Sequence, residues 1–158
     1  MLELYYRNLG KRIVKTPKLY FLDTGLACFL AGIRNVKALR DSTMLGAMFE
    51  TLALGQMMRA YANAGRVADI YFYRDHYGNE VDFLIPEGEK LKLFECKWLE
   101  IAPGRIHAFD EIAKLAGDAN IASRSLITPV RRPRFLRDRG LRMQDCVDFS
   151  PLLAEPAD

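Results

Sequence analysis

The sequence is poor in the residues that build disulfide frameworks and soft-metal sites. Its 158 residues include three cysteines (Cys28, Cys96 and Cys146) and two histidines (His76 and His107). An odd number of cysteines without CxxC spacing gives neither a disulfide framework nor a zinc knuckle. Two isolated histidines exclude a histidine-rich metal site. This usage of cysteine favours a reducing, cytosolic setting.

Long hydrophobic runs are also missing. The most apolar window, residues 19–33, is short and is interrupted by Asp23. It falls below the about 20 apolar residues that a membrane-spanning helix needs. The N-terminus lacks the apolar stretch of a signal peptide. We therefore expect a cytoplasmic protein without a membrane partner.

What is present is an ordinary globular composition, with 50% hydrophobic and 27% charged residues. It predicts one compact domain, with a small appendage. The net charge of +3 permits a nucleic acid partner without requiring one. The basic residues are unevenly spread, because seven arginines lie between Arg124 and Arg142 against the single acid Asp138.

The hydrophobic pattern predicts a basic, helical lead-in over residues 1–40 and an α/β domain over residues 41–158. A short helix in the lead-in begins near Asp23 or Thr24, either of which is a plausible N-cap, and ends near Gly32. A long helix begins near Ser42 or Thr43 and stops at Gly65. Short turns between the next strands imply an antiparallel meander. The expected order is α-β-β-β-α-β: helix 40–65, strands 67–74, 80–85 and 90–98, helix 104–117 and strand 122–130, followed by a basic loop 131–140 and a short tail.

Three charged residues interrupt strands that are otherwise apolar. Asp82 lies in the middle of strand 80–85, and Glu95 and Lys97 lie in strand 90–98. Charged side chains are rarely buried unless they are paired or bind a metal. The short turn makes the two strands neighbours, so Asp82 sits beside Glu95, and two such carboxylates repel unless a cation separates them. The alternative is a solvated sheet face whose Glu–Lys pair adds almost nothing to stability.

Strict alternation along the strands predicts which side chains share a face. It puts Asp82 on the side of Leu84 and puts Val81 and Phe83 on the opposite side. The residues at positions 95 and 97 share one face, about 6.6 Å apart. Two carboxylates suit Mg²⁺ or Mn²⁺, which prefer oxygen ligands, and a nearby lysine can stabilise charge during phosphodiester hydrolysis.

This arrangement of Asp82, a turn and Glu95-x-Lys97 resembles the PD-(D/E)xK phosphodiesterase superfamily, which includes restriction endonucleases and Holliday-junction resolvases. The resemblance implies a restriction-endonuclease-like core with the α-β-β-β-α-β order. It implies that Asp82 and Glu95 bind Mg²⁺ or Mn²⁺ and that Lys97 is catalytic. Glu50, on the first helix, would be a further metal ligand or would orient the base, and Glu80 is a reserve ligand.

Four blocks along the chain resemble the domain of unknown function that follows the ATPase module in many prokaryotic AAA+ ATPases. They are KTPKLYFLDTGLACFLAGI, LGAMFETLAL, FYRDHYGNEVDFLI and LFECKW. The sequence has no GxxxxGK[ST] motif and therefore no P-loop of its own. We expect either a fragment whose first residues are a linker remnant, with the ATPase as a partner in cis, or a natural short form.

The basic residues offer candidate contacts to DNA. Arg74, near the proposed site, and Arg131, Arg132 and Arg134, in the basic loop, are the candidates, with a solvated charged loop as the alternative. Related resolvases act as dimers, so a homodimer is a further expectation. The sequence thus predicts a metal-dependent DNA endonuclease. The competing hypothesis is a non-catalytic accessory domain that binds DNA or a protein for a AAA+ ATPase.

Overall fold

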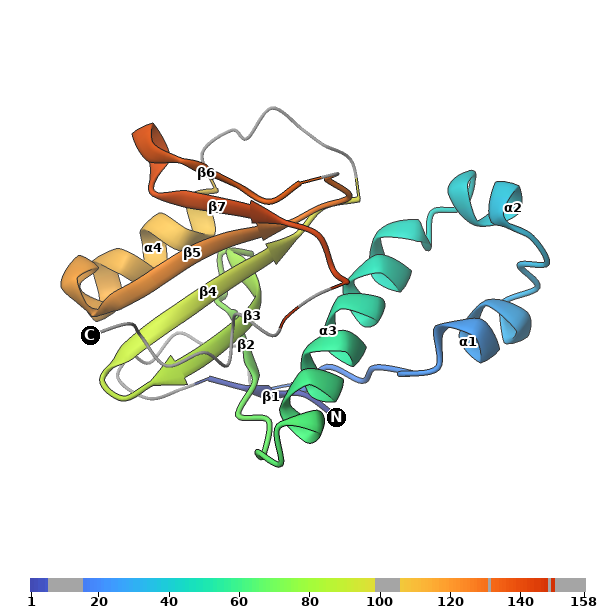
Figure 1. Cartoon of the computed structure of the whole chain (residues 1–158), viewed down its shortest axis with the longest axis horizontal. Helices are drawn as coiled ribbons and strands as arrows, with labels where there is room; N and C mark the ends of the chain where they lie inside the picture. The colour runs from blue at the N-terminus through green and yellow to red at the C-terminus, as the bar shows by residue number, and fades with distance from the viewer. Residues whose placement is uncertain (6–15, 99–105, 131, 148, 150–158) are drawn as a thin grey trace.

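The computed structural model describes residues 1–5, 16–98, 106–130, 132–147 and 149. They form a mixed α/β fold around a seven-stranded sheet with the order β1-β2-β3-β4-β5-β7-β6 (Figure 1). The strands are β1 (Glu3–Leu4), β2 (Tyr71–Arg74), β3 (Glu80–Glu87), β4 (Lys90–Cys96), β5 (Ile121–Ile127), β6 (Arg134–Leu136) and β7 (Leu141–Gln144). The α-helices are α1 (Thr24–Leu30), α2 (Val36–Arg40), α3 (Leu45–Asn63) and α4 (His107–Ala116).

The predicted antiparallel meander is present. Strand β3 pairs antiparallel with both β2 and β4. Strand β3 continues to Glu87, so the turn is shorter than the predicted 86–89 and is formed by residues 88 and 89. Gly88, at φ 60°, supplies the left-handed conformation that this tight turn requires. After β4 the chain crosses over through α4 and returns as β5, parallel to β4. The segment from α3 to β5 therefore has the expected α-β-β-β-α-β order.

The two long helices pack against opposite faces of the sheet. Helix α3 contributes Phe49, Ala53, Met57 and Tyr61 to one cluster, in which they meet sheet residues such as Phe83; we call this cluster the α3-side core. Helix α4 contributes to a second cluster, the α4-side core, whose members are Tyr73, Val81, Leu84, Leu91, Leu93, Ala108, Phe109, Ile112, Leu126, Val130, Leu141 and Met143. The central strands are therefore buried on both faces.

Helix α3 ends where the sequence predicts. Gly65 adopts φ 66° just after the helix. Its N–H bonds to the Ala62 carbonyl, and the Arg66 N–H bonds to the Tyr61 carbonyl. This pair of bonds is the Schellman arrangement, which satisfies the last helical carbonyls. The predicted start is shifted slightly, because Met44 is the N-cap residue and Ser42 Oγ accepts a hydrogen bond from its N–H.

The prediction that residues 131–140 form a basic loop, followed by a short tail without strands, is wrong. Arg134–Leu136 form strand β6, a 3₁₀ turn follows, and Leu141–Gln144 form strand β7 between β6 and β5. Strand β7 buries Leu141 and Met143 and exposes Arg142. This alternation was present in the sequence, but the many arginines around it masked the strand pattern.

The lead-in is only partly helical, because its first residues form β1, which pairs parallel with β2. Of the two predicted caps of helix α1, Asp23 is the N-cap residue, and its side chain accepts a hydrogen bond from the Leu26 N–H. Helices α1 and α2 contain no buried residue and extend away from the sheet (Figure 1). Their segment exposes several large apolar side chains: Leu19, Phe21, Leu22, Leu26, Phe29, Leu30 and Val36. In the part of the chain that the structure describes, no helix has the length and apolar character needed to cross a membrane.

Candidate functional site

A bulge in β3 reorganises the predicted faces. Between the pairs Tyr71↔Leu84 and Tyr73↔Val81, strand β2 advances by two residues and β3 by three. An extra residue of this kind breaks the alternation of side chains. Val81 therefore packs in the α4-side core, whereas Phe83 packs in the α3-side core. The prediction that Val81 and Phe83 share a face is wrong for this reason.

The bulge turns Asp82 toward the α3 side, away from the predicted side of Leu84. Its Oδ1 lies 3.9 Å from Lys18 Nζ, and its Oδ2 accepts a 2.8 Å hydrogen bond from the Cys96 N–H. The residue is only 9% exposed. Burial, followed by the negative charges of Glu95 and Glu50, raises the pKa of Asp82 to about 8. Asp82, on β3, is thus hydrogen-bonded to the last residue of β4. Burial and the neighbouring acids make ionisation of its carboxyl group unfavourable there.

Glu95 is a second buried carboxylate at the same end of the sheet. It is 8% exposed, and its Oε1 lies 2.7 Å from Lys97 Nζ. Its Oε2 is buried without a hydrogen-bond partner among the described residues. Burial raises the pKa of Glu95 against the opposing effect of Lys97, and Glu50 and Glu80 add to the rise. An unpartnered buried oxygen of this kind costs stability, which is a feature of functional sites.

Lys97 lies just beyond β4, where its N–H bonds to the Ile127 carbonyl at 2.9 Å. Its side chain is 48% exposed. Burial alone would lower the pKa of Lys97, but the hydrogen bond to Glu95 and the charge of that carboxylate outweigh burial and raise it. Lys97 is therefore a half-exposed, charged side chain that is paired with the buried Glu95.

Glu50 reaches the site from α3. Its Oε1 accepts a 2.8 Å hydrogen bond from Lys18 Nζ and another from the Tyr20 hydroxyl. Burial and the charge of Glu50 raise the pKa of Tyr20, which keeps the hydroxyl protonated as a donor. The structure therefore brings Asp82, Glu95, Lys97 and Glu50 to one region, with two residues of the lead-in among them.

Lys18, like Tyr20, is a residue of the site that was not predicted from the sequence. Its ammonium forms ion pairs with Glu50 and Glu80 and lies near Asp82, and its side chain is 16% exposed. Its backbone bonds to that of Leu2 in an isolated bridge. Lys18 was one of five basic residues between positions 7 and 18, and no local periodicity distinguishes it. Its place depends on tertiary pairing.

The predicted DNA-contacting arginines fall into two groups. Arg74 Nε lies 2.6 Å from Glu80 Oε2, at the edge of the site. Arg132 and Arg134 are exposed, and Arg131 lies outside the described residues. Register places Arg134 in one row with Glu95, through the pairs Glu95↔Leu126, Leu126↔Met143 and Met143↔Arg134. Three strand spacings, about 14 Å, separate the two backbones.

The donor chemistry of the site fits a hard divalent cation. No group of three or more His, Cys, Asp or Glu side chains within the described residues is arranged to hold a metal ion. Mg²⁺, however, commonly binds one or two carboxylates and completes its shell with water and substrate phosphate. The buried Asp82 carboxylate and the unpartnered Glu95 Oε2 supply such oxygens. The two carboxylates therefore supply the type of ligand that the ion prefers, and Lys18 lies near one of them, Asp82.

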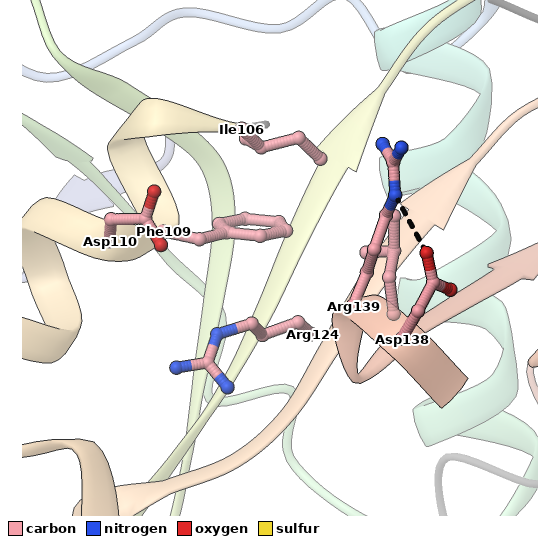
Figure 2. A pocket seen from close by; sticks show the side chains of 7 residues that line it. Ile106, Phe109, Asp110, Arg124, Asp138 and Arg139 are labelled. Atoms are coloured by element: carbon pink, nitrogen blue, oxygen red, sulfur yellow. Dashed lines mark hydrogen bonds and ion pairs between the residues drawn. The ribbon is translucent and has the colours of Figure 1, made fainter. Parts of the chain in front are cut away.

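A pocket of about 460 Å³ lies elsewhere, on the α4 side of the sheet. Figure 2 shows it between Phe109 of α4 and the turn that carries Asp138 and Arg139, which form an ion pair. Its wall includes two arginines and two aspartates, so its charges are balanced. None of the four central predicted residues lines it, and it does not coincide with the carboxylate site. The described residues that line it are Ile106, Phe109, Asp110, Arg124, Asp138, Arg139 and Leu141.

Comparison with known proteins assigns the region from α3 to β7. The family model described as "Domain of unknown function (DUF4143)" matches residues 45–145, and "Domain of unknown function (DUF8612)" matches residues 1–37. Uncharacterized proteins of Mycobacterium tuberculosis and Mycobacterium bovis are each 32% identical over 93 residues, or 59% of this chain and 20% of the relative. The match thus spans about a fifth of the length of these curated relatives. No solved structure matches the chain. The chain therefore belongs to the DUF4143 family, which is known in AAA-ATPase-associated proteins.

Proposed function

We propose that the domain is a metal-dependent DNA endonuclease of PD-(D/E)xK type on a restriction-endonuclease-like fold. The observation that carries this proposal is the pair of buried carboxylates Asp82 and Glu95, of which Glu95 keeps Oε2 without a hydrogen-bond partner among the described residues. A purely structural acid at the end of a strand would be exposed or fully paired. The burial of two acids at one end of the sheet, close enough for the charge of Glu95 to raise the pKa of Asp82, favours a binding role.

Each side chain has a role that its position supports. Asp82 and Glu95 would hold Mg²⁺ or Mn²⁺, and Glu50 would be a further ligand or would orient the base. When bound, such an ion supplies positive charge to a phosphate and lowers the pKa of a bound water. Lys97 has three N–H donors and gives one to Glu95. Its remaining donors can contact a phosphate oxygen and stabilise the charge that develops there.

The exposed arginines suggest where DNA would lie. Arg134 stands at the same end of the sheet as Glu95, about three strand spacings away. Arg132, close by in the chain, is also exposed. Positive side chains along this edge would contact successive phosphates and position the scissile bond over the carboxylates. Arg74 is less available, because Glu80 pairs with it.

A cleavage assay tests the proposal. The purified chain is incubated with supercoiled plasmid and with branched duplexes in Mg²⁺ or Mn²⁺, beside Asp82→Ala, Lys97→Ala and the double variant. Lys92→Ala is the control, because Lys92 pairs with Glu87 on the β3–β4 hairpin. We expect cleavage by the wild type and the control only. Cleavage that survives in the double variant would contradict the assignment of these residues.

A specific observation favours a second candidate function. The lead-in exposes apolar side chains, including Phe29, Leu30 and Val36, on helices without a buried residue. Exposed apolar surfaces of this kind mark contacts with other proteins. The domain would then be a non-catalytic accessory that binds DNA or a protein for an ATPase, in cis if the chain is part of a longer protein. This alternative predicts partner affinity without metal-dependent cleavage.

A further inference from the structure

The acids on the α3 side of the site have one shared neighbour. Glu50 comes from α3, and Glu80 and Asp82 come from β3, yet all three contact the ammonium of Lys18. The ammonium also lies 5.5 Å from the centre of the Phe72 ring and 5.8 Å from that of Tyr20. The lead-in thus inserts a positive charge among acids that would otherwise repel one another.

We infer that Lys18 is a built-in counter-ion that competes with a divalent cation for the carboxylates of the candidate site. This inference rests on the proposed function, since it concerns the same acids. An ammonium and a divalent cation cannot occupy the same carboxylate oxygen without strong repulsion. Asp82 Oδ2 already accepts the Cys96 N–H, so binding of the metal to Asp82 Oδ1 requires Lys18 to move away from that oxygen.

The contacts of Lys18 allow this exchange without unfolding the segment. Its backbone is fixed by two hydrogen bonds to Leu2, of 2.9 and 3.1 Å. Its ammonium, in contrast, ends a flexible four-carbon chain that can reorient. Lys18 Nζ lies 3.9 Å from Asp82 Oδ1, which is farther than its 2.8 Å contact with Glu50. The side chain can give up Asp82 and move outward while the backbone bridge stays in place.

The competition has a functional consequence for the metal-free protein. Lys18 neutralises part of the acidic cluster, so the fold tolerates its acids without an ion. A metal then binds more weakly than the carboxylates alone would allow, because it must displace the ammonium. The affinity for the ion is therefore set partly by a residue outside the acids that bind it.

The first test is calorimetric titration of Mn²⁺ into wild-type protein, Lys18→Met and Lys92→Met, each with an uncleavable duplex present to complete the coordination shell. Lys92 is a matched control because its side chain is 15% exposed and is paired with a carboxylate, Glu87, away from the site. We expect the Mn²⁺ Kd of Lys18→Met to fall at least tenfold and that of Lys92→Met to match the wild type. Equal or weaker binding by Lys18→Met, where the wild type binds, would overturn the inference and leave the proposed function standing.

Two other outcomes separate the inference from the proposed function. Binding by Lys18→Met alone would support the competition and contradict a metal-dependent activity of the wild type. Binding by none of the three proteins would overturn both.

A second measurement uses wild-type protein and does not depend on the folding of a variant. Lysines are acetylated with an N-hydroxysuccinimide ester with and without Mn²⁺, and each site is quantified by mass spectrometry. We expect Mn²⁺ to raise the modification rate of Lys18 several-fold and to leave Lys92 unchanged. Protection of Lys18 that persists at saturating Mn²⁺ would overturn the inference.

Discussion

At the scale of single residues, two aspartates show how surroundings decide the role of a carboxylate. Asp75 and Asp82 are 8% and 9% exposed. Asp75 accepts hydrogen bonds from the N–H groups of Tyr77 and Asn79 and from the Asn79 side chain. Asp82 accepts one backbone bond and faces other acids, with the Lys18 ammonium 3.9 Å from its Oδ1. Asp75 stabilises its turn, whereas Asp82 is held in a place where its charge is unfavourable.

This contrast predicts opposite effects of the same substitution. Asp82→Asn keeps an oxygen for the Cys96 N–H and removes repulsion, so it should stabilise the metal-free protein by about 0.5–2 kcal/mol. Asp75→Asn places an amide against the Asn79 amide and should destabilise the protein by about 1 kcal/mol. Thermal unfolding at neutral pH without divalent ions measures both. A loss of stability in Asp82→Asn would show that its carboxylate is structural.

At the scale of elements, helix α3 carries Glu50 to the site, and its ends define its position. The C-terminal turn depends on the left-handed conformation of Gly65, at φ 66°. Near the other end, a Cβ added at Gly46 would meet no atom within 4 Å, and the φ of Gly46 is not positive. The backbone conformation at position 65 therefore favours glycine, whereas position 46 can accept a side chain.

Alanine substitution should separate them. Gly65→Ala should destabilise the protein by about 1 kcal/mol, because an L-residue is strained at positive φ. Gly46→Ala should stabilise the helix by about 0.5–1 kcal/mol. For a chain of this size each kcal/mol moves Tm by roughly 2–4 °C. Equal shifts in the two variants, read by differential scanning calorimetry, would contradict this account of the helix end.

The elements also show what could be predicted from the sequence. The meander and α3 were predictable because their signals are local: period-two apolar runs, short turns and a glycine stop. The bulge at Asp82 was not, since it depends on the register between β2 and β3. Strand β6 was hidden because arginine dominates its segment. Lys18 reaches the site through pairing with Leu2, a long-range contact without a local pattern.

At the scale of the whole molecule, the charges are sorted along the sheet. The acids gather where β3, β4 and α3 meet, and exposed arginines lie on the far edge strand β6 and the segment before it. The paired residues from Glu95 to Arg134 form one row across four strands. In the proposed function, a nucleic acid would lie across this end of the sheet. The arginines would contact its phosphates, and the metal ion held by the acids would contact one further phosphate.

This arrangement predicts a measurable salt dependence of DNA binding. Arg134→Ala should weaken binding to duplex DNA regardless of sequence and should reduce the slope of log K against log [salt] by about 0.9, the contribution of one phosphate contact. Arg59→Ala, on an exposed position of α3, should leave the slope unchanged. Fluorescence anisotropy in EDTA measures both without cleavage. An unchanged slope for Arg134→Ala would remove this residue from the DNA path.

The most direct test of the central claim is calorimetric titration of Mn²⁺ into the wild type, Asp82→Ala and Glu95→Ala, in the presence of an uncleavable duplex that can complete the coordination shell. We expect saturable binding by the wild type and its loss in both variants, because the two buried carboxylates act on one ion. Binding that persists in either variant, or no binding by the folded wild type, would contradict the claim that Asp82 and Glu95 form a metal site.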